Sequence, residues 1–187
     1  TPGAGNLISG NEAIGILLQD PDTTGNQVLG NYIGTDVSGT TALGNYQSGI
    51  VISFGASNNI VGGTLPGTGN LISGNDYAGI HIQNSGTTGN QVLGNFIGTD
   101  ASGTMVLGNL QTGVSIIGAP NNNIIGGTAP GAGNLISGNE GSGIWLEGTG
   151  TMSNTVQGNF VGTNVSGTVV LGNLDHGVVI YLGASNN

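Results

Sequence analysis

The sequence contains neither lysine nor arginine, and its nine acidic residues give a formal net charge of −9. Binding to nucleic acid needs cations on the phosphates, so this class of function is excluded. Anionic membrane surfaces are disfavoured for the same reason. Cysteine is also absent, so no disulfide stabilises the fold and the redox compartment stays open. No apolar run reaches the length of about 18 residues that a membrane span requires.

Glycine, in contrast, is abundant, at 40 of 187 residues, without the period of three that defines collagen. Apolar residues make up 36% of the chain and are regularly placed, which argues against a disordered polar tract. The sequence starts without methionine and without a signal-peptide pattern. We therefore expect it to be a processed or excerpted part of a longer protein.

The string GNLISGN occurs three times, 64 residues apart, at residues 5–11, 69–75 and 133–139. The surrounding sequence keeps the same interval: GNQVLGNYIGTD returns as GNQVLGNFIGTD and then as SNTVQGNFVGTN. The whole chain is thus predicted to be one β-solenoid segment, with repeat units 1–64, 65–128 and 129–187. Each unit divides into two related halves, so the elementary coil has about 32 residues and six coils fit the chain.

Each coil contains three short extended segments separated by glycine, asparagine and proline. One segment alternates apolar, variable and apolar residues, as in 80–82 and 144–146, which places the repeated pair inside and the variable residue outside. A second segment, N-x-[IV]-x-G, has apolar residues at intervals of 32: Val28, Ile60, Val92, Ile124 and Val156. No 3.6-residue apolar period occurs, so helices are not expected. Coils stacked about 4.8 Å apart would share one core.

An asparagine follows a glycine at one fixed position of every coil. Stacked asparagines can hydrogen-bond to one another and tolerate the left-handed backbone of tight corners. We predict a structural ladder formed by Asn11, Asn45, Asn75, Asn109, Asn139 and Asn173.

The pattern N-x-[IV]-x-G-N-x3-G-[IV]-x-[IL] resembles the right-handed parallel β-helix repeats of the pectate-lyase-like superfamily. More narrowly, it is similar to the GNLISGN/GNFIGTD repeat arrays of large secreted or surface proteins of bacteria. The resemblance implies a right-handed parallel β-helix with uncapped ends and an extracellular or cell-surface location. The superfamily includes lyases, hydrolases, adhesins and structural rods, so the resemblance does not decide the activity.

Catalysis is not expected from these residues. Lyases of the superfamily use a basic side chain beside a calcium-binding carboxylate cluster, and this chain has no lysine or arginine. Hydrolases of the superfamily use clustered aspartates, whereas Glu12, Asp76 and Glu140 recur two coils apart, about 9.6 Å. A repeated acid is a property of the repeat, while a catalytic site is normally unique. We predict a non-enzyme without catalytic or cofactor-binding residues.

A few residues remain candidates for binding. Asp36 and Asp100, in the motif GTDxSG, could each offer calcium one carboxylate together with hydroxyl and carbonyl oxygens. His81 and Trp145 share an outward column two coils apart, and the indole could stack on a sugar ring. The acid–base pair at 175–176 has no serine or cysteine repeated against it, so no catalytic triad is predicted.

These features favour an acidic, extracellular or cell-surface structural protein that acts as a stalk, fibre or filament. Its coils would stack on further coils of the same chain or, end to end, on another copy, because an uncapped solenoid end is a pairing template. The alternative is a carbohydrate-binding or carbohydrate-active β-helix, or an adhesin segment. An extracellular glycan is then the expected partner, and nucleic acid and a membrane span are not.

Overall fold

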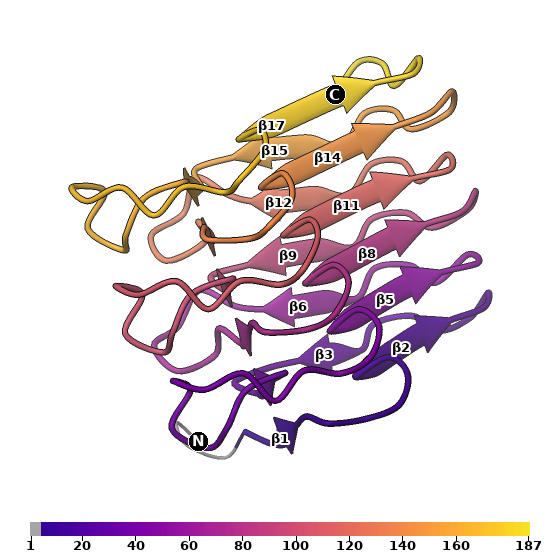
Figure 1. The fold of residues 1–187 in the computed structure, drawn as a ribbon. Helices are drawn as coiled ribbons and strands as arrows, with labels where there is room; N and C mark the ends of the chain where they lie inside the picture. The colour runs from indigo at the N-terminus through magenta and orange to yellow at the C-terminus, as the bar shows by residue number, and fades with distance from the viewer. Residues whose placement is uncertain (1–4) are drawn as a thin grey trace.

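The computed structural model describes residues 5–187, which fold into a stack of coils built only from parallel strands and turns (Figure 1). The strands form three sheets, and neighbours in each sheet belong to successive coils. Crossover connections between parallel strands are almost always right-handed, and the described chain is a right-handed parallel β-helix, as predicted.

The three sheets are named A, B and C here. Sheet A consists of β1 (Leu7–Ile8), β4 (Tyr32–Ile33), β7 (Leu71–Ile72), β10 (Phe96–Ile97), β13 (Leu135–Ile136) and β16 (Phe160–Val161). Sheet B consists of β2 (Ile16–Gln19), β5 (Ile50–Ser53), β8 (Ile80–Gln83), β11 (Val114–Ile117), β14 (Ile144–Glu147) and β17 (Val178–Tyr181). Sheet C consists of β3 (Gln27–Val28), β6 (Ile60–Gly62), β9 (Gln91–Leu93), β12 (Ile124–Gly126) and β15 (Thr155–Gln157).

Two sheets have six strands and the third has five, so the described residues make between five and six coils. No helix in this part of the chain has the length and apolar character that crossing a membrane requires.

The core is a set of aliphatic columns that run along the axis. In β8, the side chains of Ile80 and Ile82 are fully buried, while His81 between them points outward and is half-buried. Strand β11 repeats this arrangement in register, with Val114 beside Ile80 and Ile116 beside Ile82. The predicted alternation in this segment is therefore confirmed.

The predicted spacing in sheet C is wrong by one residue in alternate coils. Val28 pairs with Val61, not with Ile60, and Val92 pairs with Ile125, not with Ile124. Both Val61 and Ile125 are fully buried, whereas Ile60 and Ile124 face outward and are half-buried. The cause is the corner between sheets B and C, whose length alternates: equivalent asparagines are 33 and then 31 residues apart, so a uniform interval of 32 misses the register.

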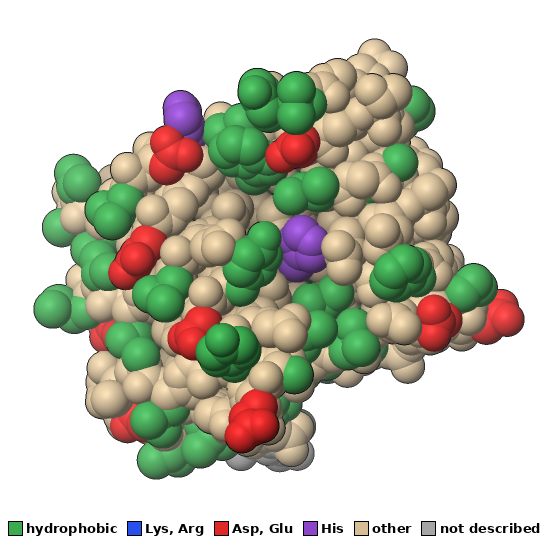
Figure 2. Space-filling view, turned by 45° about the vertical axis from the view of Figure 1, so that its right-hand side comes forward, with side chains coloured by type: hydrophobic (Ala, Val, Ile, Leu, Met, Phe, Trp, Pro, Cys, Tyr) green, Lys and Arg blue, Asp and Glu red, His purple; other side chains and the backbone are tan. Residues whose placement is uncertain are grey.

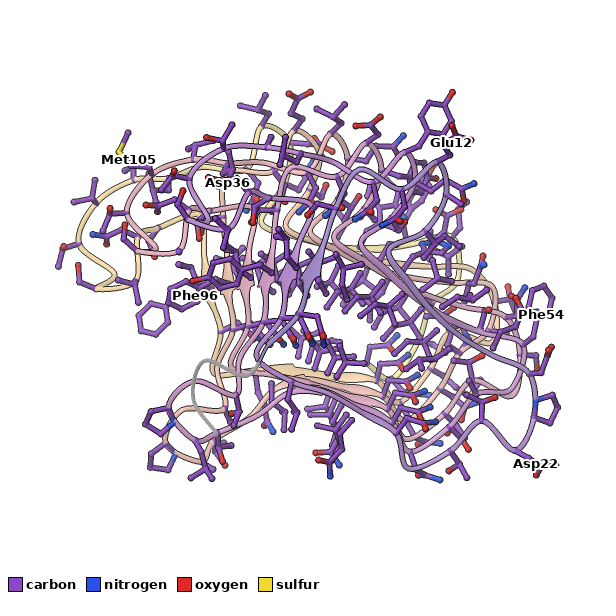
Figure 3. All side chains as sticks on the ribbon, turned by 90° about the horizontal axis from the view of Figure 1, so that it is seen from below. Glu12, Asp22, Asp36, Phe54, Phe96 and Met105 are labelled. Atoms are coloured by element: carbon purple, nitrogen blue, oxygen red, sulfur yellow. The ribbon has the colours of Figure 1, made fainter. Side chains whose placement is uncertain are left out.

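Two rows of loops flank the outer face of sheet A (Figure 3). One row comprises residues 34–43, 98–107 and 162–171, and the other comprises residues 62–69 and 126–133. Loops of the first row lie one repeat apart yet bond directly, since the Ala101 amide donates to the Gly39 carbonyl at 2.9 Å and the Val165 amide donates to the Gly103 carbonyl at 3.0 Å. These backbone bonds extend the stacking of the coils into the loops.

Candidate functional site

Asparagine side chains form three hydrogen-bonded columns along the solenoid. The first ladder joins Asn6, Asn31, Asn70, Asn95, Asn134 and Asn159. The second ladder joins the six asparagines singled out above, Asn11, Asn45, Asn75, Asn109, Asn139 and Asn173. The third ladder joins Asn26, Asn59, Asn90, Asn123, Asn154 and Asn187.

Asn75 illustrates the geometry of an interior ladder position. Its Oδ1 accepts hydrogen bonds from both the backbone N–H of Asn45, at 3.3 Å, and Nδ2 of Asn45, at 2.8 Å. Its own Nδ2 donates to Oδ1 of Asn109 at 2.9 Å and to the Ile33 carbonyl at 3.2 Å. The side chain is fully buried, so these bonds supply the partners that buried polar groups need. In every ladder Nδ2 donates toward the C-terminal neighbour, which gives the column a fixed direction.

Sequence reasoning found one ladder and missed two. The missed asparagines also follow glycine, but in the first ladder the interval alternates between 25 and 39 residues because one connection in each pair of coils carries a long loop. A search for the sum, 64 residues, would have found both.

Asp36 and Asp100 lie in equivalent loops, where each carboxylate closes its own turn. Oδ1 of Asp36 accepts from the amides of Thr40 at 2.9 Å and Thr41 at 3.0 Å, and Oδ2 accepts from the Ser38 hydroxyl at 2.6 Å. These bonds, that from Ser38 first, lower the pKa of Asp36 to about 2. In the third loop Asn164 accepts the equivalent three bonds through Oδ1. The position thus needs an acceptor oxygen and tolerates the loss of the charge.

Calcium at Asp36 and Asp100 remains a prediction. Both carboxylate oxygens of Asp36 already have partners within the loop. Across residues 5–187, no group of three or more His, Cys, Asp or Glu side chains has the arrangement to hold a metal ion.

His81 lies in the outer column of sheet B, with Ser115 and then Trp145 following it along the axis. Its Nδ1 hydrogen-bonds to the Ser115 hydroxyl, its Nε2 lies 3.0 Å from Oε1 of Gln83, and the Tyr77 ring meets it edge-on at 6.1 Å. Burial lowers the pKa of His81, which keeps the imidazole neutral at pH 7.

Ser115, His81 and Gln83 form a hydroxyl–imidazole–amide chain, but its surroundings do not favour nucleophilic catalysis. The Ser115 side chain is only 4% exposed. Strand β11 is paired with β8 on one side and with β14 on the other, which engages the backbone amides that could otherwise stabilise an oxyanion.

Trp145 is held by its own neighbours. Its Nε1 donates to Oε2 of Glu147 at 2.7 Å, and its ring packs edge-on against Tyr181 with centroids 5.9 Å apart. His81 and Trp145 thus share a column without touching one another, because Ser115 separates them.

Asp175 and His176 contact each other, with Nδ1 of His176 2.6 Å from Oδ1 of Asp175. The structure adds Ser142, whose hydroxyl donates to Oδ2 of Asp175 at 2.9 Å. These contacts lower the pKa of Asp175, that with His176 first. The carboxylate stands between the hydroxyl and the imidazole, so the imidazole is not placed to take the serine proton as a triad requires.

The outer face of sheet A is the floor of a groove, and Phe96 points into it between the two rows of loops (Figure 3). The hollow measured around Tyr32 and Phe96 has a volume of about 540 Å³, and Leu65, Pro66 and Ala101 contribute to its walls. The outward column of the floor alternates leucine with an aromatic residue: Leu7, Tyr32, Leu71, Phe96, Leu135 and Phe160. Sequence reasoning missed this groove because its walls come from loops of different coils.

Comparison with known proteins adds no relative: no protein-family model, no curated protein and no solved structure matches the chain. The functional argument therefore depends on the geometry described above.

Proposed function

We propose that the chain is a structural segment of an extracellular or cell-surface rod, which serves as a stalk, fibre or filament and belongs to the pectate-lyase-like type of β-helix. Its role is to extend by stacking identical coils, within one polypeptide or between copies. Neither catalysis nor a cofactor takes part in this role.

The observation that carries the proposal is the repetition of one interface along the axis. The bonds from Asn45 to Asn75 recur from Asn75 to Asn109 and from Asn109 to Asn139, with Nδ2–Oδ1 distances of 2.8, 2.9 and 2.9 Å. Each coil therefore presents donors to one neighbour and acceptors to the other. Further coils can be added without a new kind of contact, which is the property that repeat proteins use to build elongated shapes.

The proposal is tested by changing the number of repeats. A second copy of residues 65–128 inserted after residue 128 should add two coils, about 9.6 Å, to the particle length. Small-angle X-ray scattering measures the length, and electron microscopy of native material and of a concentration series detects filaments. A chain with the extra repeat that collapses to a globule of unchanged length would contradict the proposal.

A glycan-binding segment is the second candidate, and the groove over sheet A is the observation that favours it. Tyr32 and Phe96 lie two coils apart, about 9.6 Å, on a floor of leucine. Regularly spaced aromatic rings offer stacking surfaces to successive sugar rings of a chain. Binding to a glycan array should then fall in Phe96→Ala and persist in Phe54→Ala, which removes an exposed ring at a corner after sheet B. Equal binding by both variants would exclude the groove.

A further inference from the structure

A column of acidic and apolar side chains runs along one edge of the solenoid, directly beside the second asparagine ladder. The column, called the ridge here, consists of Glu12, Tyr46, Asp76, Leu110, Glu140 and Leu174. All six are exposed, and Tyr46 and Leu174 reach 70% and 77%. Figure 2 shows acidic and hydrophobic side chains alternating along this edge.

The ladder holds the ridge in place, because each ridge residue directly follows a ladder asparagine. The amide of Asp76 donates to the Asn45 carbonyl at 3.0 Å, and that of Leu110 donates to the Asn75 carbonyl at 2.9 Å. Successive ridge residues are therefore about one coil, 4.8 Å, apart, and successive acids are about 9.6 Å apart. The spacing is fixed before any partner arrives, which reduces the ordering cost of binding.

The ridge carboxylates have no partner of opposite charge in the chain, since the sequence contains neither lysine nor arginine. Within residues 5–187, no hydrogen bond to the side chains of Glu12, Asp76 or Glu140 is formed. Glu12, Tyr46 and Asp76 instead line a hollow of about 500 Å³. Apolar side chains extend beside the ridge, where Met105 is 65% exposed and Val170 is 82% exposed. Exposed apolar surface edged by unpaired charge is typical of an interaction site.

We propose that the ridge docks a basic amphipathic polypeptide segment of a partner protein, whose cations face the carboxylates and whose apolar side chains face Tyr46, Leu110 and Leu174. A second copy of the chain does not fit this role, because it would bring only further carboxylates to the ridge. The inference goes beyond the proposed rod, since it makes the rod a carrier along its side.

An α-helix matches the ridge in length scale. Seven helical residues rise about 10.5 Å, against about 9.6 Å for two coils, so the two differ by about 1 Å per step. Basic residues at positions i, i+7 and i+14 would therefore face the three acids in turn. Leucines at i+4 and i+11 would lie near the apolar ridge residues between them.

The probe for the test is a synthetic helix of about 20 residues with lysine at i, i+7 and i+14 and leucine at i+4 and i+11. Fluorescence anisotropy measures its binding to the full chain. The triple variant Glu12→Gln, Asp76→Asn, Glu140→Gln should weaken binding about tenfold, because three exposed ion pairs of modest strength are lost. Increasing the salt concentration should weaken binding to the unaltered chain and affect the variant much less.

The matched control is the triple variant Asp20→Asn, Asp22→Asn, Glu147→Gln, whose acids lie away from the ridge. Both variants remove three carboxylates and change the net charge from −9 to −6. The control should bind within about twofold of the unaltered chain, since long-range attraction is screened beyond a Debye length. Equal weakening by the two variants, or none by the ridge variant, would overturn the proposal. Circular dichroism verifies that both variants fold, and either result leaves the test of rod length unaffected.

Discussion

Asn75 and Asp76 are neighbours in the sequence and opposites in the structure. Asn75 is fully buried and bonded to the coils before and after it, and its column contains asparagine in every coil. Asp76 is exposed, and its column alternates between acids and apolar residues. The side of the backbone that faces the neighbouring coil is constrained by stacking, whereas the other side is free to carry a surface pattern. Substitutions on the two sides should accordingly differ greatly in their effects.

The largest expected effect is the loss of one interior ladder rung. Asn75→Ala leaves the Asn45 amide without its acceptor and Oδ1 of Asn109 without a donor in the apolar interior. We expect the free energy of unfolding to fall by about 4 kcal/mol, from unsatisfied groups and a small cavity. Urea denaturation followed by circular dichroism measures it. Asp76→Asn, its control, should change stability by less than about 0.5 kcal/mol; similar values for both would mean that the ladder is not what stabilises the stack.

The next effect comes from a glycine against which the following coil packs. Gly34 has φ +90°, and a methyl group there would overlap the Ser73 carbonyl and Oδ1 of Asn75. Gly34→Ala should therefore cost about 3 kcal/mol, because the backbone of two coils must separate. Gly25 also has a left-handed φ, +70°, but open space around it. Gly25→Ala should cost about 1 kcal/mol, and a Gly34 variant no worse than this in thermal unfolding would contradict the close approach.

A third change should stabilise the chain. Ala119 has φ +76° at a corner position where equivalent coils carry Gly55, at +92°, and Gly183, at +85°. Ala119→Gly relieves the left-handed strain and should add about 1 kcal/mol, which raises Tm by about 2–4 °C. Ala13→Gly, at an exposed position with ordinary φ, should instead lower Tm slightly. Scanning calorimetry distinguishes the two, and a lower Tm for both would refute the strain argument.

The smallest effect concerns the acid loops. The folded pKa of Asp36 is lowered from 3.8 to about 2 by its hydrogen bonds, that from Ser38 first. Its contribution to stability is therefore present above pH 3.8 and is lost as pH falls through about 2. Asp36→Asn should be nearly neutral at pH 7, as Asn164 in the third loop suggests, and should flatten this part of the stability–pH curve. An unchanged curve between pH 4 and pH 2 would assign that dependence to other carboxylates.

The fold could be predicted from the sequence because its signal is repeated. The fixed interval of 64 residues, the short strand pattern and the absence of helical periodicity each limit the architecture, and the glycines mark the corners. What could not be predicted was the register in sheet C, where Val61 and Ile125 replace Ile60 and Ile124 in the core. Adjacent apolar residues give no local sign of which one faces inward, and the one-residue alternation in corner length decides it.

The surface was harder to predict than the core. The pairing of Ser142 with Asp175, and the groove around Phe96, depend on residues from different coils and loops, whose proximity is set by stacking and not by sequence distance. His81 and Trp145 were correctly assigned to one column, but their partners Ser115 and Glu147 follow from side-chain geometry. Local patterns define which face a residue occupies, and contacts between coils require the three-dimensional register.

The fixed direction of the ladders has an electrical consequence. Each carboxamide is a dipole whose amide end points toward the C-terminal neighbour, so three aligned dipoles are added with every coil. Sheet dipoles are small, so the ladder contribution does not disappear in the sum. The rod is therefore positive in the C-terminal direction, the reverse of an α-helix. Its dipole moment grows in proportion to its length, so long rods should turn in an electric field, and two rods lying side by side should favour opposite directions.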